Sequence, residues 1–285
     1  MPEADRTWKG ARWWKVDFHT HTPASLDYGK GPGQAAHQAR QPRDWLLDFM
    51  AAGVDCVAVT DHNSGAWIDL LKNELTGLEA TRPQGYRPLF LFPGVEISGN
   101  GGVHVLAVFD PTASTADIDS LLGAVAFDGT KGESDGVTRR SLVQVLEEIG
   151  NAGGIAIPAH VDGPRGLFRE LRGTSLEQVL THDSVFAMEV LNPKSEKPEL
   201  YRSLKTSWTE VVGSDSHHPT SQGGPRFPGS HFTWVKMGQP SLEGLRLALL
   251  DGPLSILRSD QVTSDPNAHA ALVLESLEVE AARYM

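Results

Sequence analysis

Histidines recur in this sequence at the ends of short apolar runs. The first such run ends in His-Thr-His, which places His19 and His21 two residues apart. If the run is a β-strand, side chains two residues apart lie on the same face, so both imidazoles point the same way. Two such imidazoles can bind a single metal ion. A pair of this kind is weak evidence on its own, and its weight depends on the residues at the ends of the other apolar runs.

The same pattern marks the later apolar runs. The second run ends in TDH, the third contains PGVEIS, the fourth contains GGVHV, and two later runs end in IPAH and GSDSH. These runs add six candidate ligands: His62, Glu96, His104, His160, Asp215 and His217. The loop after the first run adds one more carboxylate, Asp27. Imidazoles and carboxylates suit zinc, manganese or iron, and a shared carboxylate can bridge two ions. Water on such ions ionises near neutral pH, so the set points to metal-assisted hydrolysis.

Other residues of these types receive different predictions. Asp61 is expected to orient a ligand histidine and not to bind metal, because adjacent residues on a strand point to opposite faces; the same argument removes His218. Cys56, the single cysteine, lies in an apolar run and is predicted to be a buried strand residue, not a nucleophile. The role of His231 is left open. The histidines expected to be solvent-exposed are His37, His182 and His269.

The apolar runs are short and rich in β-branched residues, which predicts strands. They cover residues 16–19, 56–60, 89–95, 103–109, 155–159, 187–191, 211–213 and 232–235. Helical spacing of apolar residues between many of them, for example around Trp45 and Leu146, predicts a largely parallel sheet. Seven or eight strands with polar residues at their C-terminal ends favour a closed barrel. The short link SGNGG before residues 103–109 predicts a hairpin that makes the barrel irregular.

Length and charge limit the classes of function. A chain of 285 residues can form one barrel domain. Its 36 acidic and 25 basic residues give a net charge of −11, which argues against broad electrostatic capture of nucleic acid, although bound divalent ions would reverse the local field. No apolar stretch is long enough for a membrane span and the N-terminus does not resemble a signal peptide, so a cytoplasmic protein is expected.

Two glycine-rich loops, residues 128–136 and 220–229, are either mobile flaps near the site or plain surface loops. Two arginines are candidate contacts for a substrate phosphate: Arg165, which comes after the strand of His160, and Arg226, in the second of these loops. The alternative for each is an ordinary surface arginine.

Taken together and in this order, HTH, TDHN, PGVEIS, IPAH and GSDSH resemble the motifs of the PHP (polymerase and histidinol phosphatase) superfamily. The resemblance implies an irregular (β/α)7 TIM-like barrel with two or three divalent ions at the C-terminal ends of its strands. It assigns ligands to three ions: the first to His19, His21, Glu96 and Asp215, the second to Glu96, His104 and His160, and the third to Asp27, His62 and His217. Asp27 lies one residue further from His21 than is common in small phosphoesterases of the family, so the third ion departs most from the family pattern.

A closer resemblance covers RWWKVDFHTHTPASLDYG, CVAVTDHNSGAWID and FPGVEISGNGGVHVLAVFD, which are similar to the N-terminal PHP domain of TrlF-type proteins, where it is fused to an SMC-like or AAA-like ATPase. No GxxxxGK[ST] phosphate loop occurs in this chain, and LESLEVEAARYM resembles the opening strand of that ATPase. The resemblance implies a PHP phosphoesterase domain over residues 1–260, a linker with the first strand of an absent ATPase domain over residues 261–285, and an ATPase domain or subunit as partner.

The favoured hypothesis is a metal-dependent phosphoesterase in which a metal-bridging hydroxide attacks phosphorus. The residues expected to carry catalysis are His19, His21, Glu96, His160, Asp215 and His217. The ATPase context favours nucleic acid, cleaved by a 3'-5' exonuclease or other nuclease, or nucleotides; the acidic net charge favours phosphomonoester hydrolysis on a small metabolite. A non-catalytic, metal-stabilised module that docks an ATPase is a second class. C–N bond hydrolysis, as in amidohydrolase barrels, is a third, against which the glutamate of PGVEIS argues.

Overall fold

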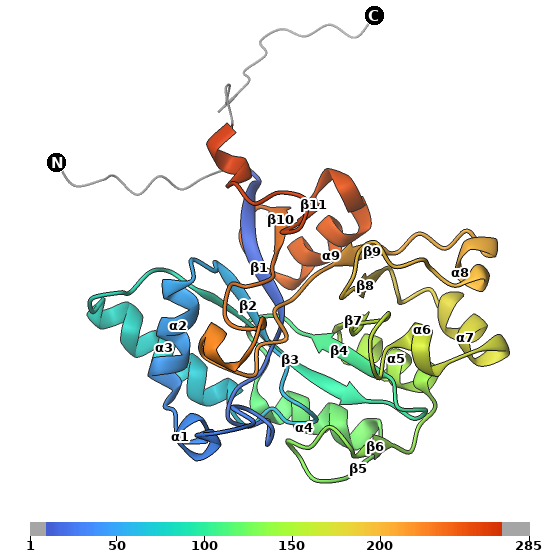
Figure 1. Ribbon diagram of the computed structural model, residues 1–285, viewed down its shortest axis with the longest axis horizontal. Helices are drawn as coiled ribbons and strands as arrows, with labels where there is room; N and C mark the ends of the chain where they lie inside the picture. Colours follow the sequence, from blue (N-terminus) through green and yellow to red (C-terminus); the bar gives the residue numbers. More distant parts are fainter. Residues whose placement is uncertain (1–9, 270–285) are drawn as a thin grey trace, which may run out of the picture.

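The computed structural model of the chain describes residues 10–269, which form a curled β-sheet surrounded by helices (Figure 1). The strands are β1 (Arg12–Thr20), β2 (Cys56–Val59), β3 (Phe90–Ser98), β4 (His104–Val108), β5 (Phe127–Asp128), β6 (Val137–Thr138), β7 (Ile155–Pro158), β8 (Ala187–Glu189), β9 (Thr209–Val211), β10 (Thr233–Met237) and β11 (Ile256–Arg258). The α-helices are α1 (Gln34–Gln38), α2 (Pro42–Ala51), α3 (Ile68–Thr81), α4 (Thr115–Ala124), α5 (Leu142–Asn151), α6 (Leu167–Glu170), α7 (Gly173–Leu180), α8 (Glu199–Ser203) and α9 (Leu242–Asp251). Three short 3-10 helices are η1 (Ser221–Gly223), η2 (Gly252–Leu254) and η3 (Pro266–His269).

The strands close into an irregular barrel. One sheet has the order β11-β10-β1-β2-β3-β4-β7, and β8 and β9 form a second, parallel pair. Strands β1, β2 and β3 are parallel, whereas β4 is antiparallel to both β3 and β7. Backbone hydrogen bonds from Val161 N to Glu189 O and from Asp215 N to His19 O connect the second sheet to β7 and to β1. The predicted barrel with an irregular β3–β4 hairpin is therefore confirmed.

The sheet is less parallel than the alternation of strands and helices predicts. The strand predicted over residues 232–235 is β10, and it pairs antiparallel with the N-terminal half of β1 and with β11, outside the barrel. The physical reason is the length of β1, which pairs with β2 only from Val16 onward. Its first residues would otherwise leave backbone donors and acceptors without partners, and β10 supplies them.

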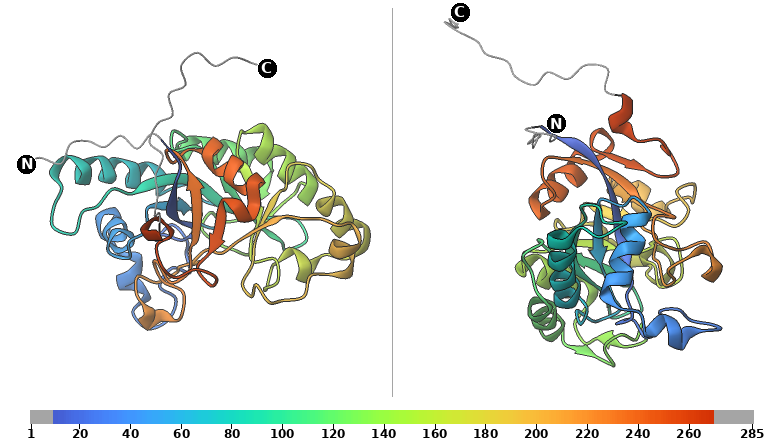
Figure 2. Two further views of the ribbon diagram at one scale, coloured as in Figure 1. Left: turned by 90° about the horizontal axis from the view of Figure 1, so that it is seen from above. Right: turned by 90° about the vertical axis from the view of Figure 1, so that its left-hand side faces the viewer.

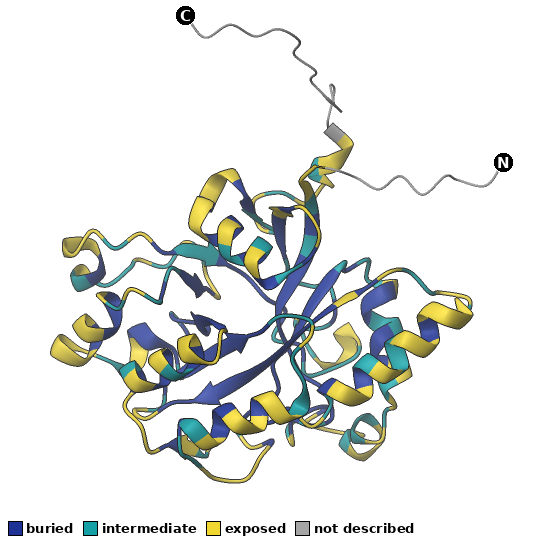
Figure 3. Ribbon diagram, turned by 180° about the vertical axis from the view of Figure 1, so that it is seen from behind, coloured by how far each residue is buried: buried dark blue, intermediate teal, exposed yellow. Residues whose placement is uncertain are grey.

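Two apolar clusters hold the fold together. One gathers alternate strand residues such as Phe18, Ala58 and Ile157 with the apolar face of α9, and it includes Cys56, which is buried in β2 as predicted. The other packs the helices on the opposite strand faces. Figure 3 shows this arrangement, with buried strands in the middle and exposed outer faces on the helices. The strands are thus fixed on both sides, which gives their C-terminal ends defined positions.

The first and last described segments lie side by side (Figure 2). The side-chain amide of Asn267, in η3, accepts a hydrogen bond from Trp13 N at 3.0 Å and donates one to Trp13 O at 2.9 Å. The domain boundary predicted after residue 260 stays a prediction, and residues 270–285, with the predicted ATPase strand, lie outside the described residues. Within residues 10–269, no helix is both long and apolar enough to cross a membrane.

Candidate metal centre

All nine candidate ligands lie at one end of the barrel, and we call them the ligand cluster. They come from the following places: His19 and His21 from the end of β1, Asp27 from the loop after it, His62 from the end of β2, Glu96 from β3, His104 from the start of β4, His160 from the end of β7, and Asp215 and His217 from the segment after β9. Because β4 is antiparallel, its first residue meets the last residues of the parallel strands at one edge. The reversed strand therefore contributes to the cluster from its N-terminal end.

Four of these side chains face one another most directly. His19 Nε2 lies 3.1 Å from His21 Nε2. Glu96 Oε2 lies 3.4 Å from His19 Nε2 and 3.7 Å from His21 Nε2. Asp215 Oδ1 lies 3.5 Å and 3.3 Å from the same two nitrogens. Two imidazole nitrogens and two carboxylate oxygens thus converge on one small volume.

The second oxygen of Glu96 faces a different pair of imidazoles. Glu96 Oε1 lies 2.6 Å from His104 Nδ1 and 3.1 Å from His160 Nε2. The His62 ring also reaches this carboxylate, with His62 Nδ1 at 2.7 Å from Glu96 Oε2. Glu96 is buried and its two oxygens contact different imidazoles, so it spans two parts of the cluster.

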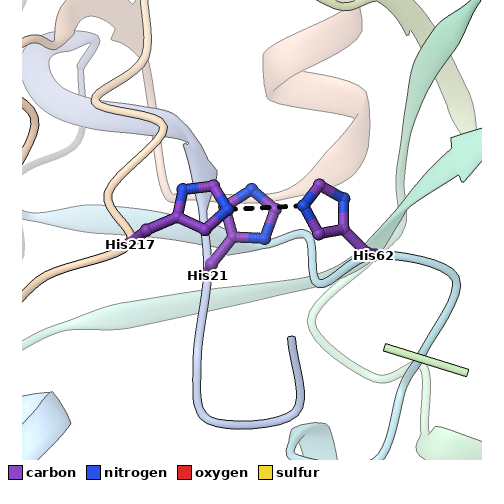
Figure 4. Close-up of side chains that lie close together, drawn as sticks. All are labelled: His21, His62 and His217. Carbon is purple, nitrogen blue, oxygen red and sulfur yellow. Dashed lines mark hydrogen bonds between the residues drawn. The ribbon is translucent and has the colours of Figure 1, made fainter. Parts of the chain in front are cut away.

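A third group of donors surrounds Asp27. Its two oxygens lie 3.4 Å from His62 Nε2 and 3.4 Å from His217 Nε2, and these two nitrogens are 3.3 Å apart. Figure 4 shows His62 and His217 pointing toward each other beside His21. The rings of His21 and His217 are stacked, with centroids 3.8 Å apart.

The hydrogen bonds of the HTH pair show why these rings can bind metal. His19 Nδ1 lies 2.8 Å from a carboxylate oxygen of Glu189, which only accepts. His21 Nδ1 lies 2.9 Å from Ser25 Oγ, whose own proton goes to Asp61 Oδ1 at 2.7 Å. Both Nδ1 atoms therefore carry protons, and the two Nε2 lone pairs face each other, an arrangement that needs a shared proton or a shared cation.

Buried atoms without partners point to the same conclusion. Among residues 10–269, the buried atoms Asp27 Oδ1, His62 Nδ1 and Glu96 Oε2 make no hydrogen bond of good geometry, although His62 Nδ1 lies 2.7 Å from Glu96 Oε2 and Asp27 Oδ1 lies 3.4 Å from His217 Nε2. Leaving such a group unsatisfied costs about 1–3 kcal/mol, and a bound cation would remove that cost for the oxygens. The donor set of imidazole nitrogens and carboxylate oxygens fits divalent ions such as zinc, manganese or iron.

Three subsets of the cluster place their donor atoms within 4.8 Å of one another: His19, His21 and Glu96; His21, His62 and His217; and His62, Glu96 and His104. The second and third subsets differ from the assignment that the PHP resemblance implies, which groups His62 and His217 with Asp27 and groups His104 with His160. The rings of His104 and His160 contact the same oxygen of Glu96, so the geometry accommodates either grouping of His104. The assignment of ligands to individual ions stays a prediction.

Electrostatics within the cluster reflect this mixture of imidazoles and carboxylates. Burial alone would raise the pKa of Glu96, but the surrounding imidazoles outweigh burial and hold that pKa well below its usual range. Burial alone would lower the pKa of His19, but the carboxylates around it, Glu189 first, raise it well above its usual value. The pKa of His21 is lowered well below its usual value by burial and by neighbouring imidazoles. Divalent cations would displace the protons that balance the carboxylates here.

Asp61 is linked to His21 through Ser25, and its role in orienting a ligand histidine stays a prediction. It accepts hydrogen bonds of 2.7 Å from the backbone and the hydroxyl of Thr22 and from Ser25 Oγ, and Ser25 in turn holds His21. Ser25 Oγ also accepts from His62 N at 3.1 Å. Burial raises the pKa of Asp61 to about 6, and the bonds from Thr22 and Ser25 act against that rise.

We predict that Ser25→Ala weakens metal binding about tenfold, the lower end of what lost outer-shell partners cost, because the Nδ1 proton of His21 would lose its acceptor. Titration of the metal-free protein with zinc, followed by calorimetry, measures the change. Ser120→Ala removes an exposed serine that bonds only Ala116 O, and it should bind zinc like the unsubstituted protein. Equal affinity in both variants would contradict the role of Ser25.

The loop of residues 128–136 is attached to the cluster. Gly132 N donates to His62 O at 2.8 Å, and Asn63 Nδ2 donates to Glu133 O at 2.9 Å. Gly132 has φ 91°, and a Cβ there would lie 2.4 Å from Ala24 O, so only glycine fits this approach. The loop therefore forms part of the wall of the site.

The two predicted phosphate contacts lie in different surroundings. Arg226 Nη1 lies 3.3 Å from Asp215 Oδ2 and bonds Ser214 O at 3.2 Å, so its guanidinium borders the cluster. Arg165 Nη1 bonds Ser134 O at 2.6 Å, and its other nitrogen pairs with Asp135, so it is tied to the loop of residues 128–136. A substrate role for either arginine stays a prediction.

Several residues of the site have a left-handed backbone although they are not glycine. Their φ angles are 46° at Asn63, 29° at His160, 57° at Arg165 and 48° at Asp215. Such conformations cost about 1–3 kcal/mol each and persist only where the surroundings enforce them. At His160 and Asp215 the backbone turns directly at a candidate ligand.

The remaining histidines lie outside the cluster. His37 packs edge-on against His218 and His182 Nδ1 lies 2.7 Å from Ser184 Oγ, so both side chains are partly buried and not solvent-exposed as expected. A distant residue, His218, covers His37, whereas a neighbour in the same turn, Ser184, covers His182. His231 lies beside Ser230. The side chain of His269 lies outside the described residues.

Sequence reasoning missed Glu189. It lies in β8, is 1% exposed and holds His19. The available signal is the run FAMEVL, in which one charged residue interrupts an apolar strand. A charge inside a buried strand needs a partner, and that requirement could have marked Glu189 as part of the site.

No protein-family model and no curated protein matches this chain. Among solved structures, the lesion-specific endonuclease PfuEndoQ from Pyrococcus furiosus has a TM-score of 0.61 and 15% identity and covers 84% of this chain. Endonuclease Q in complex with a 27-mer duplex bearing an abasic lesion has a TM-score of 0.58 and 15% identity over 83% of this chain. A structure described as a metal-dependent phosphoesterase from Bifidobacterium adolescentis has a TM-score of 0.49 and 18% identity, covering 83% of this chain and 96% of its own.

These likenesses concern the fold. The matches cover 56% of each endonuclease chain, so the present chain corresponds to about half of those proteins. At 15% identity the shared property is the irregular α/β barrel, in agreement with the prediction from the sequence motifs. What the chain does must be argued from its own residues.

Proposed function

We propose that this chain is a metal-dependent phosphoesterase of the PHP superfamily that cleaves nucleic acid or nucleotides. The observation that carries the proposal is the buried carboxylate of Glu96, whose two oxygens face separate imidazoles within one ligand cluster. A carboxylate in that position suits two neighbouring cations, as phosphoryl-transfer sites with more than one metal require. The order of the sequence motifs supports the same family.

The bound ions and the residues around the ligand cluster would have separate tasks in this reaction. Divalent ions, when bound, supply an ionised water near neutral pH and neutralise charge on the phosphoryl oxygens. Glu189 keeps the proton of the His19 ring on Nδ1, and Ser25 does the same for His21. The Nε2 atom of each ring therefore has a lone pair that can bind a metal ion. Arg226, at the border of the cluster, could contact a non-bridging phosphate oxygen if substrate displaces it from Asp215.

Nucleic acid is favoured as substrate because the barrel is shared with endonuclease Q, a protein crystallised with a 27-mer duplex substrate that carries an abasic lesion. The net charge of −11 opposes broad electrostatic capture, so recognition would depend on the site and on ions within it. The same charge favours the second candidate, phosphomonoester hydrolysis on a small metabolite. Association with an SMC-like or AAA-like ATPase rests on the motif resemblance alone, and the comparisons add no support for it.

The test combines metal content with three substrates. Elemental analysis should find two or three divalent ions per chain, and the protein should hydrolyse at least one of a generic phosphodiester, a phosphomonoester and labelled single-stranded DNA. His19→Ala and Asp215→Ala should lose that activity and part of the metal, since both residues lie in the ligand cluster. His182→Ala, a substitution outside the cluster, should keep both.

Each outcome discriminates. Preferential hydrolysis of the phosphomonoester would select the metabolite phosphatase, whereas preference for single-stranded DNA would select the nuclease. A protein that carries its ions but hydrolyses none of the three substrates would overturn the proposal and favour the non-catalytic module.

A further inference from the structure

We infer that Glu189 is the positioning residue of the metal centre, acting on two cluster histidines from two strands through a single carboxylate oxygen. The inference rests on the proposed metal centre and concerns which residue gives that centre its shape. Glu189 Oε2 lies 2.8 Å from His19 Nδ1 and accepts a hydrogen bond of 3.0 Å from His160 N. His19 lies near the end of β1 and His160 comes just after β7, so one oxygen contacts a ring on β1 and the backbone turn that follows β7.

The burial of Glu189 is costly, which indicates that its contacts with His19 and His160 have a specific role. The side chain is 1% exposed in an apolar strand, where an ionised carboxylate costs several kcal/mol unless partners compensate. Its other oxygen, Oε1, makes no hydrogen bond within residues 10–269. A glutamine, or an apolar residue of the same size, would tie the strands together at a lower desolvation cost, so a carboxylate serves a purpose beyond strand pairing.

That purpose is visible in the ring of His19. A carboxylate can only accept, so the proton of the neutral ring stays on Nδ1 and the lone pair of Nε2 faces Glu96 and Asp215. A carboxylate partner also makes the imidazole a stronger donor than a neutral partner does. Glu189 thereby decides both which nitrogen of His19 faces the ions and how strongly it binds them.

The contact to His160 adds a second effect. His160 has φ 29°, and its backbone N–H donates to Glu189 at the point of that turn. The adjacent Val161 N donates to Glu189 O at 2.9 Å, so both the side chain and the backbone of Glu189 hold this turn. The turn directs His160 Nε2 to within 3.1 Å of Glu96 Oε1.

Ser25 repeats the arrangement with a neutral acceptor. Its hydroxyl oxygen accepts from the ring of His21 and from the backbone of His62, as Glu189 does for His19 and His160. Each histidine of the HTH motif is thus held by an oxygen that also holds the backbone of a histidine on another strand. The Glu189 acceptor carries the charge itself, whereas Ser25 relies on Asp61 behind it.

Two substitutions separate charge from shape. Glu189→Gln keeps an oxygen that can accept both hydrogen bonds and removes the charge, whereas Glu189→Met keeps the bulk and removes the acceptor. We expect zinc affinity about tenfold lower in the glutamine variant and about a hundredfold lower in the methionine variant, the range found for outer-shell partners of ligand histidines. The matched control is Glu210→Gln on the paired strand β9, where Glu210 contacts Lys197 and Arg258 and not the cluster.

The decisive readouts are calorimetric zinc affinity and the nuclear magnetic resonance signal of the His19 Nδ1 proton in zinc-loaded protein. That proton should resonate far downfield with Glu189, move upfield in the glutamine variant and vanish by exchange in the methionine variant. If both variants bind zinc like the control and keep the downfield signal, Glu189 only connects the strands and does not position the metal ligands. If the methionine variant does not fold, the glutamine variant alone decides, since it conserves size and acceptor.

Neither readout depends on hydrolysis. A protein that binds zinc as described but hydrolyses no phosphate ester would remove the proposed phosphoesterase and leave the role of Glu189 intact. Unchanged zinc affinity and an unchanged His19 signal in active variants would remove only the role of Glu189.

Discussion

Glu96→Gln is expected to reduce hydrolysis by roughly 10³-fold or more, which corresponds to about 4 kcal/mol of transition-state stabilisation. The carboxylate is buried and each oxygen faces a different set of imidazoles. An amide keeps the shape but replaces one anionic oxygen by an NH2 group that cannot bind a cation. The buried imidazoles would also lose the charge that balances them.

The measurement is kcat/KM on the best of the three test substrates, together with zinc content by elemental analysis. Glu147→Gln, an exposed glutamate of α5, is the matched control and should retain both. We expect the glutamine variant at residue 96 to hold at least one ion fewer per chain. Retention of full activity would show that Glu96 does not connect two metal ions and would contradict the proposed metal centre.

Gly213→Ala is expected to lower the unfolding temperature and the metal content together. A Cβ at residue 213 would lie 2.7 Å from His19 Cβ, 2.8 Å from His19 N and 2.9 Å from Glu189 Oε1. Because one of these atoms is backbone, no side-chain rotation can relieve the overlap. Overpacking of this kind costs about 1–3 kcal/mol, or roughly 2–12 °C for a domain of this size.

Thermal unfolding with and without a chelator measures this effect, and elemental analysis measures the ions. Gly123→Ala is the control, since a Cβ there meets open space within α4 and should leave stability equal or slightly higher. An alanine variant at 213 with unchanged unfolding temperature and full metal content would contradict the packing described around His19.

The sequence was most informative where chemistry and local pattern coincide. His19 and His21 are recognisable by their spacing, and the apolar runs before them predict the strands that bring Glu96 and Asp215 to the same edge. Those inferences need only the alternation of a strand and the rule that parallel strands share an edge. The hairpin of β3 and β4 was predictable from its short glycine-rich link in the same way.

Contacts between segments that are distant in the sequence could not be predicted from the sequence. Nothing local in β10 says that it runs antiparallel beside the start of β1, because that choice depends on which backbone groups remain unpaired elsewhere. Glu189 was missed for a related reason: its partners, His19 and His160, are 170 and 29 residues away. Contacts between residues this far apart depend on how the barrel closes, and the spacing of apolar residues along the chain does not indicate that.

The left-handed backbone at Asn63, His160, Arg165 and Asp215 also bears on how such a site is inherited. Glycine at any of these positions would keep the turn and relieve torsional strain, but at His160 and Asp215 it would also remove a candidate ligand, so selection for thermal stability alone would act against those two side chains. This chain has glycine at many of its other left-handed turns, so the non-glycine residues at these four positions carry a cost to folding that glycine would avoid. In a related protein that no longer used the centre, glycine would therefore be expected to replace His160 and Asp215 at little cost to the backbone.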